Sequence, residues 1–293
     1  MRVTLLDRLA SSYAVIYLRG NKIAVFWLGV LAAIWLIAAL APVVATHDPL
    51  RQSADLLEGP STRHWMGTDE FGRDLFSRIV YGGRISLSVG IIAVTIAVLA
   101  GSALGLIAGY TGRLVDTVIM RFIDGLMAFP SIILAILIMA VLGPSLVNVM
   151  IAVGISAVPW YARTVRGSTL SVMQSQFVES AQAVGASGGR IVVRHILPNV
   201  AAPIIVLGTL GMATSILAIA GLSFLGLGAH PPSPEWGAML SSARTYMGRA
   251  SWYAAFPGLA IMVSVLAMNI IGDALRDILD PRLRGSIGGG DRG

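Results

Sequence analysis

The sequence predicts an all-α membrane protein with six transmembrane helices. Three observations support this: the composition, the length of the apolar runs and the placement of the charges. Hydrophobic residues make up 56% of the 293 residues and charged residues only 12%, and the mean hydropathy is +0.79. A soluble globular domain carries about 25% charged residues, so these charges are too few to cover a soluble surface. Lipid is therefore the natural solvent of the fold.

Long apolar stretches indicate where the helices lie. A helix that crosses a bilayer needs about 20 apolar residues, because its backbone polar groups must be satisfied internally. Six stretches meet this requirement: Ile23–Ala45, Ile85–Tyr110, Val118–Leu142, Leu146–Tyr161, Pro203–Leu227 and Ala254–Ile278. The first run exceeds the roughly 7–15 apolar residues of a cleaved signal peptide, so we expect a retained anchor. Pro159 is expected to kink the fourth helix.

The basic residues predict the orientation. If the N-terminus is cytoplasmic, 14 of the 21 lysines and arginines fall in inside segments and seven fall outside. Basic residues favour the cytoplasmic side, so both termini are expected there. The predicted organisation is a cytoplasmic N-terminus (1–22), a first transmembrane helix (23–45), an external loop (46–84), a five-helix core (85–280) containing a cytoplasmic loop at about 162–202, and a cytoplasmic tail (281–293).

Several functions are disfavoured by the composition and by missing motifs. The sequence has no cysteine, which excludes disulfides and thiol nucleophiles. Its net charge of +6 does not indicate nucleic-acid binding, since the arginines flank apolar segments. A Walker A motif needs Gly-Lys-Ser/Thr, and the sole lysine, Lys22, is followed by Ile23. We therefore expect no ATPase site and no catalytic residue in this chain.

The predicted inside loop has a sequence pattern of its own. Its first part places Phe177, Ala181 and Val184 at helical spacing, and Gly185 follows where a helix would end. A second short helix is expected from Ile191 towards Pro198. From the pattern alone, a helix lying on the lipid surface remains an alternative.

The loop also carries a motif. The spacing Glu179-x-Ala181-x3-Gly185, followed by Leu197-Pro198, resembles the "EAA" signature of binding-protein-dependent ABC importer permeases. Ser180 departs from the family pattern, and His195 occupies the usual isoleucine position. The resemblance implies the type I ABC importer permease fold, with this helix coupling the permease to an ATPase subunit. The coupling residues would be Phe177, Glu179, Ala181, Gly185, Leu197 and Pro198. Glu179 can accept a charge-assisted hydrogen bond from the partner.

A second match lies in the predicted external loop. The run from His64 to Asp74 looks like the segment before the second span in the C-type subunit of dipeptide, oligopeptide and nickel importers, and segments 231–237 and 272–284 are similar to the same subfamily. The predicted external interface comprises Gly67, Thr68, Asp69, Gly72, Arg73 and Asp74.

Metal binding in this loop is disfavoured by the linear spacing. His47, His64, Asp69 and Asp74 lack a tight ligand spacing such as His-x3-His. We interpret them as turn and interface residues, and expect the two aspartates to pair with Arg73 or Arg78.

Few polar residues fall inside the predicted spans. Arg121 and Asp124 are three apart and are expected to pair on one helix face. Asn269 is a candidate for lining the transport pathway, with helix–helix hydrogen bonding as the alternative. Gly101, Gly105 and Gly109 form a small-residue stripe typical of close helix packing.

The resemblance also implies partners and a location. The family works as a heterodimer with a companion permease, with two ATPase subunits that hold ATP and Mg and with an external substrate-binding protein, in the bacterial inner membrane. This chain itself would bind no cofactor and no metal. Peptide is the favoured substrate and a nickel complex the alternative. The rival from another class is an ion-coupled secondary transporter, which would need a titratable group in mid-membrane.

Overall fold

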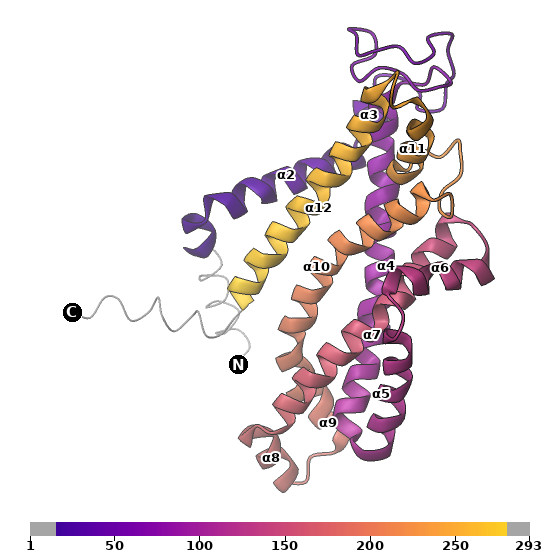
Figure 1. Cartoon of the computed structure of the whole chain (residues 1–293). Helices are drawn as coiled ribbons and strands as arrows, with labels where there is room; N and C mark the ends of the chain where they lie inside the picture. Colours follow the sequence, from indigo (N-terminus) through magenta and orange to yellow (C-terminus); the bar gives the residue numbers. More distant parts are fainter. Residues whose placement is uncertain (1–15, 280–293) are drawn as a thin grey trace.

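The computed structural model describes residues 16–279, which form a bundle of long helices (Figure 1). Five helical stretches are long and apolar enough to cross a membrane. They are α2 (Lys22–Ala39), α4 (Leu75–Thr111), α7 (Leu146–Met173), the continuous stretch Gly188–Phe224 and α12 (Ser251–Leu279). A sixth crossing is possible for α5 (Arg113–Met127) and α6 (Ser131–Leu142), which are joined at a bend of 91°.

Shorter elements lie at the two ends of the bundle. The stretch before the fifth span consists of α8 (Gln176–Ala183), α9 (Gly188–Ile191) and a π-helical turn η1 (Val192–Ile196), which leads into α10 (Leu197–Phe224). The other end holds α3 (Ala41–Val44), α11 (Trp236–Ala243) and the 3-10 turn η2 (Arg244–Tyr246). Within residues 16–279 the only strand-like pairing is an isolated bridge between Thr68 and Asp74.

Three predicted boundaries need correction. The second span begins at Leu75 rather than Ile85, so the external loop ends at Asp74 and not at residue 84. The first turns of α4 contain the buried Arg78 and the exposed Arg84, and hydropathy does not detect a helix of that composition. The fourth span continues to Met173, and Pro159 lies inside it without ending it. The inside loop is therefore shorter than 162–202.

The predicted third span, Val118–Leu142, is a broken helix. Pro130 precedes Ser131 as the N-cap of α6, and the chain turns by 91° between α5 and α6. Proline restricts the residue before it to extended conformations, which ends α5 before the turn. A hydropathy window averages across such a break and cannot locate it.

The small-residue stripe on α4 packs closely on α7, as predicted. A Cβ added at Gly105 would lie 2.9 Å from the backbone nitrogen of Arg166, and one at Gly101 would lie 3.1 Å from the nitrogen of Ala162. Only glycine allows the two backbones to approach so closely. This helix pair has the most extensive packing among the described elements.

Two ion pairs connect α5 to α7. Asp124 pairs with Arg163, and Asp116 accepts from Arg166 Nη2 at 2.6 Å. The predicted pairing of Asp124 with Arg121 is therefore wrong. The reason is geometric: Arg163 reaches Asp124 across the helix interface, which sequence spacing within one helix cannot reveal.

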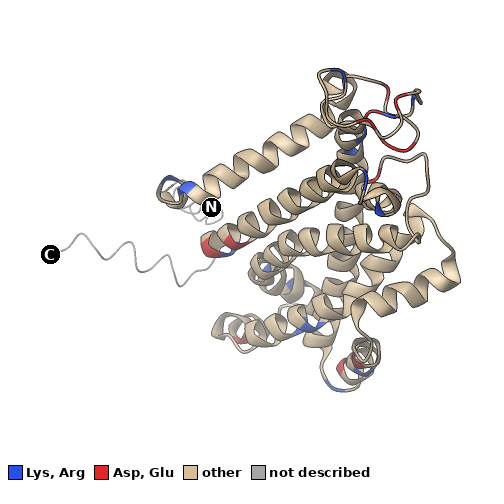
Figure 2. Cartoon of the chain, turned by 45° about the horizontal axis from the view of Figure 1, so that its top comes forward, with Lys and Arg blue, Asp and Glu red and all other residues tan. Residues whose placement is uncertain are grey.

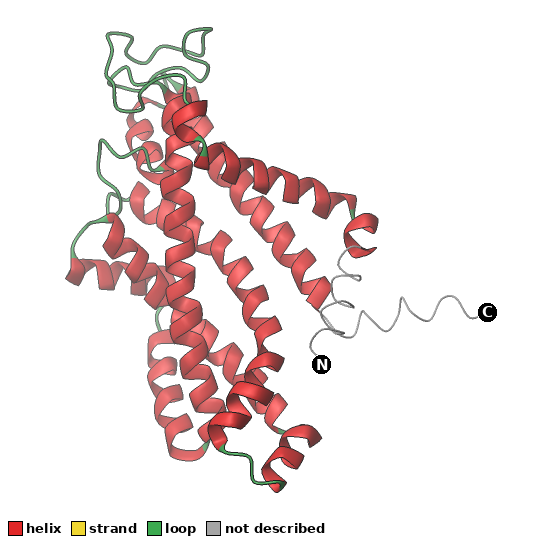
Figure 3. Ribbon diagram, turned by 180° about the vertical axis from the view of Figure 1, so that it is seen from behind, coloured by secondary structure: helices red, strands yellow, loops and turns green. Residues whose placement is uncertain are grey.

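The two long loops lie at opposite ends of the molecule (Figures 1 and 3). The loop 46–74 lies beyond the start of α4, and α8 projects from the other end. Charged residues gather near helix ends and in the loop 46–74, while the long middle parts of the helices carry few (Figure 2). The Tyr17 hydroxyl donates to Asp277 Oδ2 at 2.8 Å, so both ends of the described chain lie together. The tail 281–293 and most of segment 1–22 fall outside the described residues.

Candidate coupling surface and translocation pocket

The short helix α8 is held by a defined turn at its C-terminal end. Gly185 has φ +77°, a left-handed conformation that glycine adopts without steric cost. Its N–H donates to the Gln182 carbonyl at 2.9 Å, and the N–H of Ala186 donates to the Ala181 carbonyl at 3.0 Å. These two bonds form the Schellman motif that ends many helices. A Cβ at Gly185 would meet no atom within 4 Å, so the backbone conformation alone requires glycine.

One face of α8 packs on the ends of three long helices. Val178 is fully buried and Ala181 nearly so. Val178 packs in a cluster with Ile191, Ile196 and Val200. Further contacts come from the end of α4 (Leu106, Tyr110), the end of α7 (Val172, Met173) and the start of α10 (Ile204). One apolar cluster thereby contains side chains from α8 and from the ends of α4, α7 and α10.

The opposite face of α8 is exposed within the described part of the chain. The side chain of Phe177 is 45% exposed and that of Val184 is 84% exposed. Glu179 is also exposed, in the first turn of the helix. The sequence predicted that Phe177, Ala181 and Val184 form one apolar face. In the structure only Ala181 of these three faces inward, together with Val178.

The remaining predicted coupling residues lie at the start of α10. Leu197 and Pro198 are both exposed, beyond the π-helical turn that ends at Ile196. Ile196 is fully buried, whereas His195 is half-buried with its ring 6.4 Å from that of Phe177. Ile196 thus supplies the buried aliphatic side chain beside the position where His195 departs from the family pattern. The coupling role of all six residues stays a prediction.

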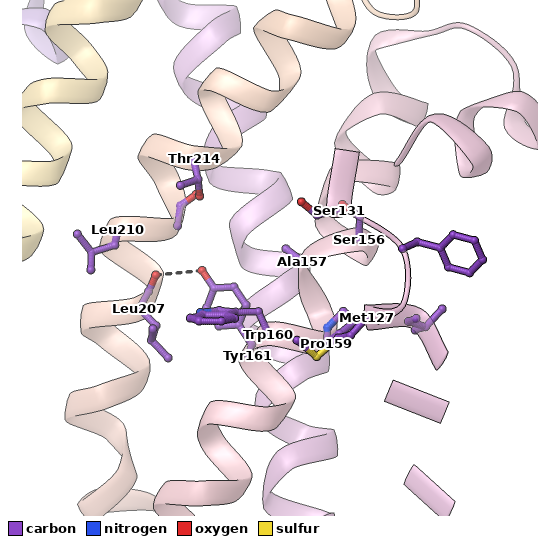
Figure 4. A pocket seen from close by; sticks show the side chains of 13 residues that line it. Met127, Ser131, Ser156, Ala157, Pro159, Trp160, Tyr161, Leu207, Leu210 and Thr214 are labelled. Atoms are coloured by element: carbon purple, nitrogen blue, oxygen red, sulfur yellow. Dashed lines mark hydrogen bonds between the residues drawn. The ribbon is translucent and has the colours of Figure 1, made fainter. Parts of the chain in front are cut away.

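A pocket of about 480 Å³ opens where α5 and α6 break (Figure 4). It is lined by Leu126, Met127, Phe129, Ser131, Ser156, Ala157, Pro159, Trp160, Tyr161, Leu207, Leu210, Gly211 and Thr214. The Tyr161 hydroxyl donates to the Leu207 carbonyl at 3.0 Å and connects α7 to α10 across the pocket. The lining combines apolar and aromatic surface with a few hydroxyls, which is typical of small-molecule sites.

Sequence reasoning did not identify this pocket. Its lining residues come from α5, α6, α7 and α10, and the only signals in the sequence were Pro130 and Pro159. Asn269, the predicted pathway residue, is half-buried on α12 and does not line this pocket. Its role in the pathway stays a prediction.

The predicted external-interface residues have a role within their own loop. The side chains of Thr68, Asp69, Arg73 and Asp74 are almost fully buried. The loop also contains two glycines in the left-handed region, Gly67 at φ +79° and Gly72 at φ +69°. These residues support the loop from inside. That this loop contacts a partner remains a prediction. Such a contact would involve exposed side chains of the loop and not these buried ones.

Asp69 is the centre of the external loop. Its Oδ1 accepts from the backbone nitrogens of Phe71 and Arg73, each at 2.9 Å, and its Oδ2 lies 2.6 Å from Arg73 Nε and 3.4 Å from Arg78 Nε. The predicted pairing of Asp69 with these arginines is confirmed. Asp74 differs: its Oδ2 accepts from the backbone N–H of Ser77 and caps α4, while its Oδ1 faces His64.

These features together define a class of protein. The membrane-length helices α7 and α10 line a pocket, and the amphipathic helix α8 projects from one end with an exposed face. This arrangement is expected for a membrane permease that a partner subunit drives. The chain belongs to the family described as binding-protein-dependent transport system inner membrane component, which matches residues 101–285. Residues 11–60 match the N-terminal transmembrane domain of oligopeptide transport permease C. The predicted family and C-type subunit are thereby confirmed, and the chain is a multi-pass permease of an ABC transport system.

Several curated proteins are similar over most of the chain. The dipeptide transport system permease protein DppC of Alkalihalophilus pseudofirmus is 51% identical over 91% of this chain and 88% of its own length. The di/tripeptide transport system permease protein DppC of Pseudomonas aeruginosa is 45% identical over 84% of each chain. The glutathione transport system permease protein GsiD of Pectobacterium atrosepticum is 51% identical over 78% of this chain and 76% of its own length.

Proposed function

We propose that this chain is the C-type permease subunit of an importer for short peptides in the bacterial inner membrane, with both termini in the cytoplasm. Two of the relatives carry dipeptide or di/tripeptide transport in their names, and a third carries glutathione, itself a tripeptide. All of these substrates are short and contain amide bonds. Membership of this family leaves no support for an ion-coupled secondary transporter.

The observation that carries the proposal is the placement of α8. Its buried Val178 shares one apolar cluster with the ends of α4, α7 and α10, and α7 and α10 also line the pocket. A partner that moves α8 therefore also moves the helices on both sides of the pocket. We assign this movement to two cytoplasmic ATPase subunits, which bind ATP and Mg.

The alternating-access cycle follows from this connection. Closure of the ATPase pair displaces α8, and the packed ends of the long helices follow as rigid bodies. A companion permease completes the pathway, and an external binding protein delivers the substrate. This chain positions and releases the substrate but breaks no bond.

The pocket lining suits a substrate with varied side chains. Ser131, Ser156 and Thr214 offer hydroxyls beside aromatic and aliphatic surface, and none of the residues that line this pocket is charged. Hydroxyls can both donate and accept hydrogen bonds, which suits peptide groups without selecting one side chain. Dipeptides and glutathione are the two candidate substrates that the relatives support, and a nickel complex is the remaining alternative.

Charge reversal at Glu179 tests the coupling. The complete transporter is reconstituted in vesicles, and peptide uptake and peptide-stimulated ATP hydrolysis are measured for Glu179→Lys and Glu179→Gln. The lysine variant should reduce both rates at least about tenfold, because a lost charge-assisted contact of about 1.5–3 kcal/mol becomes repulsive. The glutamine variant should reduce them less. Normal rates for Glu179→Lys, with the subunits assembled in normal amounts, would contradict the coupling role.

The assignment of ATP hydrolysis to partner subunits and the orientation of the chain in the membrane have separate tests. The purified chain alone should hydrolyse no ATP, and activity in a clean preparation would reject the assignment of ATPase to partners. A cysteine introduced at Ser187 should react only with reagents applied from the cytoplasmic side. Comparing uptake of labelled dipeptide, glutathione and nickel chelate in the same vesicles identifies the substrate.

A further inference from the structure

A histidine in the external loop lies between carboxylates on its two sides. His64 is only 4% exposed. Its Nδ1 lies 2.9 Å from Asp74 Oδ1, and its Nε2 lies 3.7 Å from Asp55 Oδ2. Glu58 completes the second side, since ligand atoms of Asp55, Glu58 and His64 all lie within 4.8 Å of one another. This arrangement plays no part in the proposed transport mechanism.

The contact with Asp74 determines which nitrogen of His64 carries the proton. An ionised carboxylate only accepts hydrogen bonds, and Asp74 Oδ2 already accepts from the backbone of Ser77 at 2.8 Å. The bond between Asp74 Oδ1 and His64 therefore has Nδ1–H as its donor. In the neutral ring, Nε2 then presents a lone pair towards Asp55 and Glu58.

That lone pair is left without a hydrogen bond. Nε2 of His64 is buried and has no hydrogen-bond partner among the described residues, and 3.7 Å from Asp55 Oδ2 is too long for such a bond. A cation between Nε2 and the two carboxylates would take up this lone pair. Two ligands about 2.1 Å from a tetrahedral zinc ion lie roughly 3.4 Å apart, which is close to the spacing seen here.

We propose that Asp55, Glu58 and Nε2 of His64 bind one divalent transition-metal ion of the zinc class. Imidazole and carboxylate ligands suit this class, and Asp74 has the position of the outer carboxylate that orients a metal-binding histidine. Asp74 also caps α4 through Ser77, so the ion connects the external loop to the start of a membrane-spanning helix.

The backbone around the site is already ordered. Thr68 Oγ1 accepts from the N–H of Glu58 at 2.8 Å and donates to the carbonyl of Asp55. The two carboxylate residues are thereby held next to His64 without help from an ion. Their linear spacing, two intervening residues and then five, does not resemble a familiar metal motif, which is why the sequence did not favour metal here.

A second group of possible ligands faces the other nitrogen. Ligand atoms of His47, His64 and Asp74 also lie within 4.8 Å of one another, and Nδ1 of His47 lies 3.7 Å from Asp74 Oδ1. There the 2.9 Å contact between His64 and Asp74 places a proton, not a metal, between the two groups. His47 therefore provides a control that separates the two sides of the ring.

Cobalt binding to the full-length chain tests the proposal. The protein is purified in detergent, stripped with a chelator and titrated with Co²⁺, and visible absorption reports the ligand field. We expect one equivalent to bind and Zn²⁺ to displace it. Glu58→Gln and Asp55→Asn should raise the Kd at least about tenfold, whereas His47→Gln should leave it unchanged. Glu58 is exposed, so its substitution leaves the fold intact.

Substitution of Arg63 should change the Kd for Co²⁺ in the opposite direction. Its Nη1 lies 3.0 Å from the same Asp55 oxygen, and its side chain is 71% exposed. Arg63→Gln frees that oxygen and should lower the Kd for Co²⁺. Absence of saturable Co²⁺ binding in the wild-type chain would overturn the proposal. Loss of binding in His47→Gln, with binding retained in Glu58→Gln, would also overturn it.

Discussion

The external loop and the coupling segment carry motifs of similar length, but their motif residues are used in opposite ways. In the loop 46–74, the charged motif residues Asp69, Arg73 and Asp74 are buried and hydrogen-bonded to one another or to the backbone. In α8, Phe177 and Glu179 are exposed, and only small aliphatic positions face inward.

This difference shows that a polar motif alone does not mark a contact surface. A buried charge needs partners because its desolvation is costly, so a motif of alternating acids, arginines and glycines can be the internal framework of a loop. An exposed aromatic and an exposed acid on a helix held at one glycine have no such internal use. The first motif predicts effects on folding and the second predicts effects on coupling.

The largest expected effect is on the stability of the external loop. Asp69→Asn removes the carboxylate that pairs with two buried guanidinium groups, and leaves Arg73 only the longer contact with Glu70 and Arg78 only its bonds to backbone carbonyls. We expect a loss of about 3–5 kcal/mol in the free energy of unfolding, measured by thermal and chemical unfolding in detergent. Asp48→Asn, at an exposed position of the same loop, should change stability by less than about 0.5 kcal/mol. Equal losses of stability in Asp69→Asn and Asp48→Asn would show that burial of a carboxylate does not determine its contribution.

The next largest effect on stability is expected in the packing of α4 against α7, the helix pair that connects the loop 46–74 to α8. A methyl group at Gly105 would lie 2.9 Å from the backbone nitrogen of Arg166 on α7, so Gly105→Ala should cost about 1–3 kcal/mol. Gly167→Ala on α7 meets no atom within 4 Å and should be neutral or slightly stabilising, because alanine favours helix. Unfolding midpoints of the two variants test this, and a stable Gly105→Ala protein would contradict the close packing.

A smaller effect on stability, with a larger effect on coupling, is expected at Gly185. Its φ of +77° costs a residue with a Cβ about 1–2 kcal/mol. Gly185→Ala should therefore leave membrane insertion intact but lower peptide-stimulated ATP hydrolysis several-fold. Gly185→Asn should keep more of the stimulation, because asparagine visits the left-handed region more readily. If alanine and asparagine behave alike, the turn is not what positions α8.

The smallest expected effect is a pH dependence at α11. Glu235 is buried and caps α11 through the N–H groups of Gly237 and Ala238, and burial raises its pKa above the usual 4.5. The folded state then holds this proton more tightly than the unfolded state, so the stabilisation is complete below pH 4.5 and declines as pH rises through the raised pKa.

Substitution of Glu235 separates this contribution from others. Glu235→Gln should flatten the fall of the melting temperature with rising pH, while Glu179→Gln, at an exposed position, should leave the wild-type slope. A wild-type slope in Glu235→Gln would mean that another group titrates.

Much of the fold could be predicted because membrane helices are recognisable locally. Apolar runs identified five of the long helices, and the glycine stripe on α4 predicted its close packing with α7. The end of α8 at Gly185 was equally predictable, since a left-handed turn favours one residue type. The start of α4 was not, because Arg78 is buried by loop residues far away in the sequence.

Composition and hydropathy were sufficient to establish a helical membrane protein and most of its helices, and the resemblance of a short motif to a permease signature indicated the segment proposed to meet the ATPase. Each of these depends on interactions within a few residues of one another, or on transfer from water to lipid. The broken third span, the partner of Asp124, the pocket and the carboxylates around His64 emerged only with the packed helices and the folded loop. They depend on side chains that meet across distant parts of the chain, and such distances follow from packing geometry rather than from spacing along the sequence.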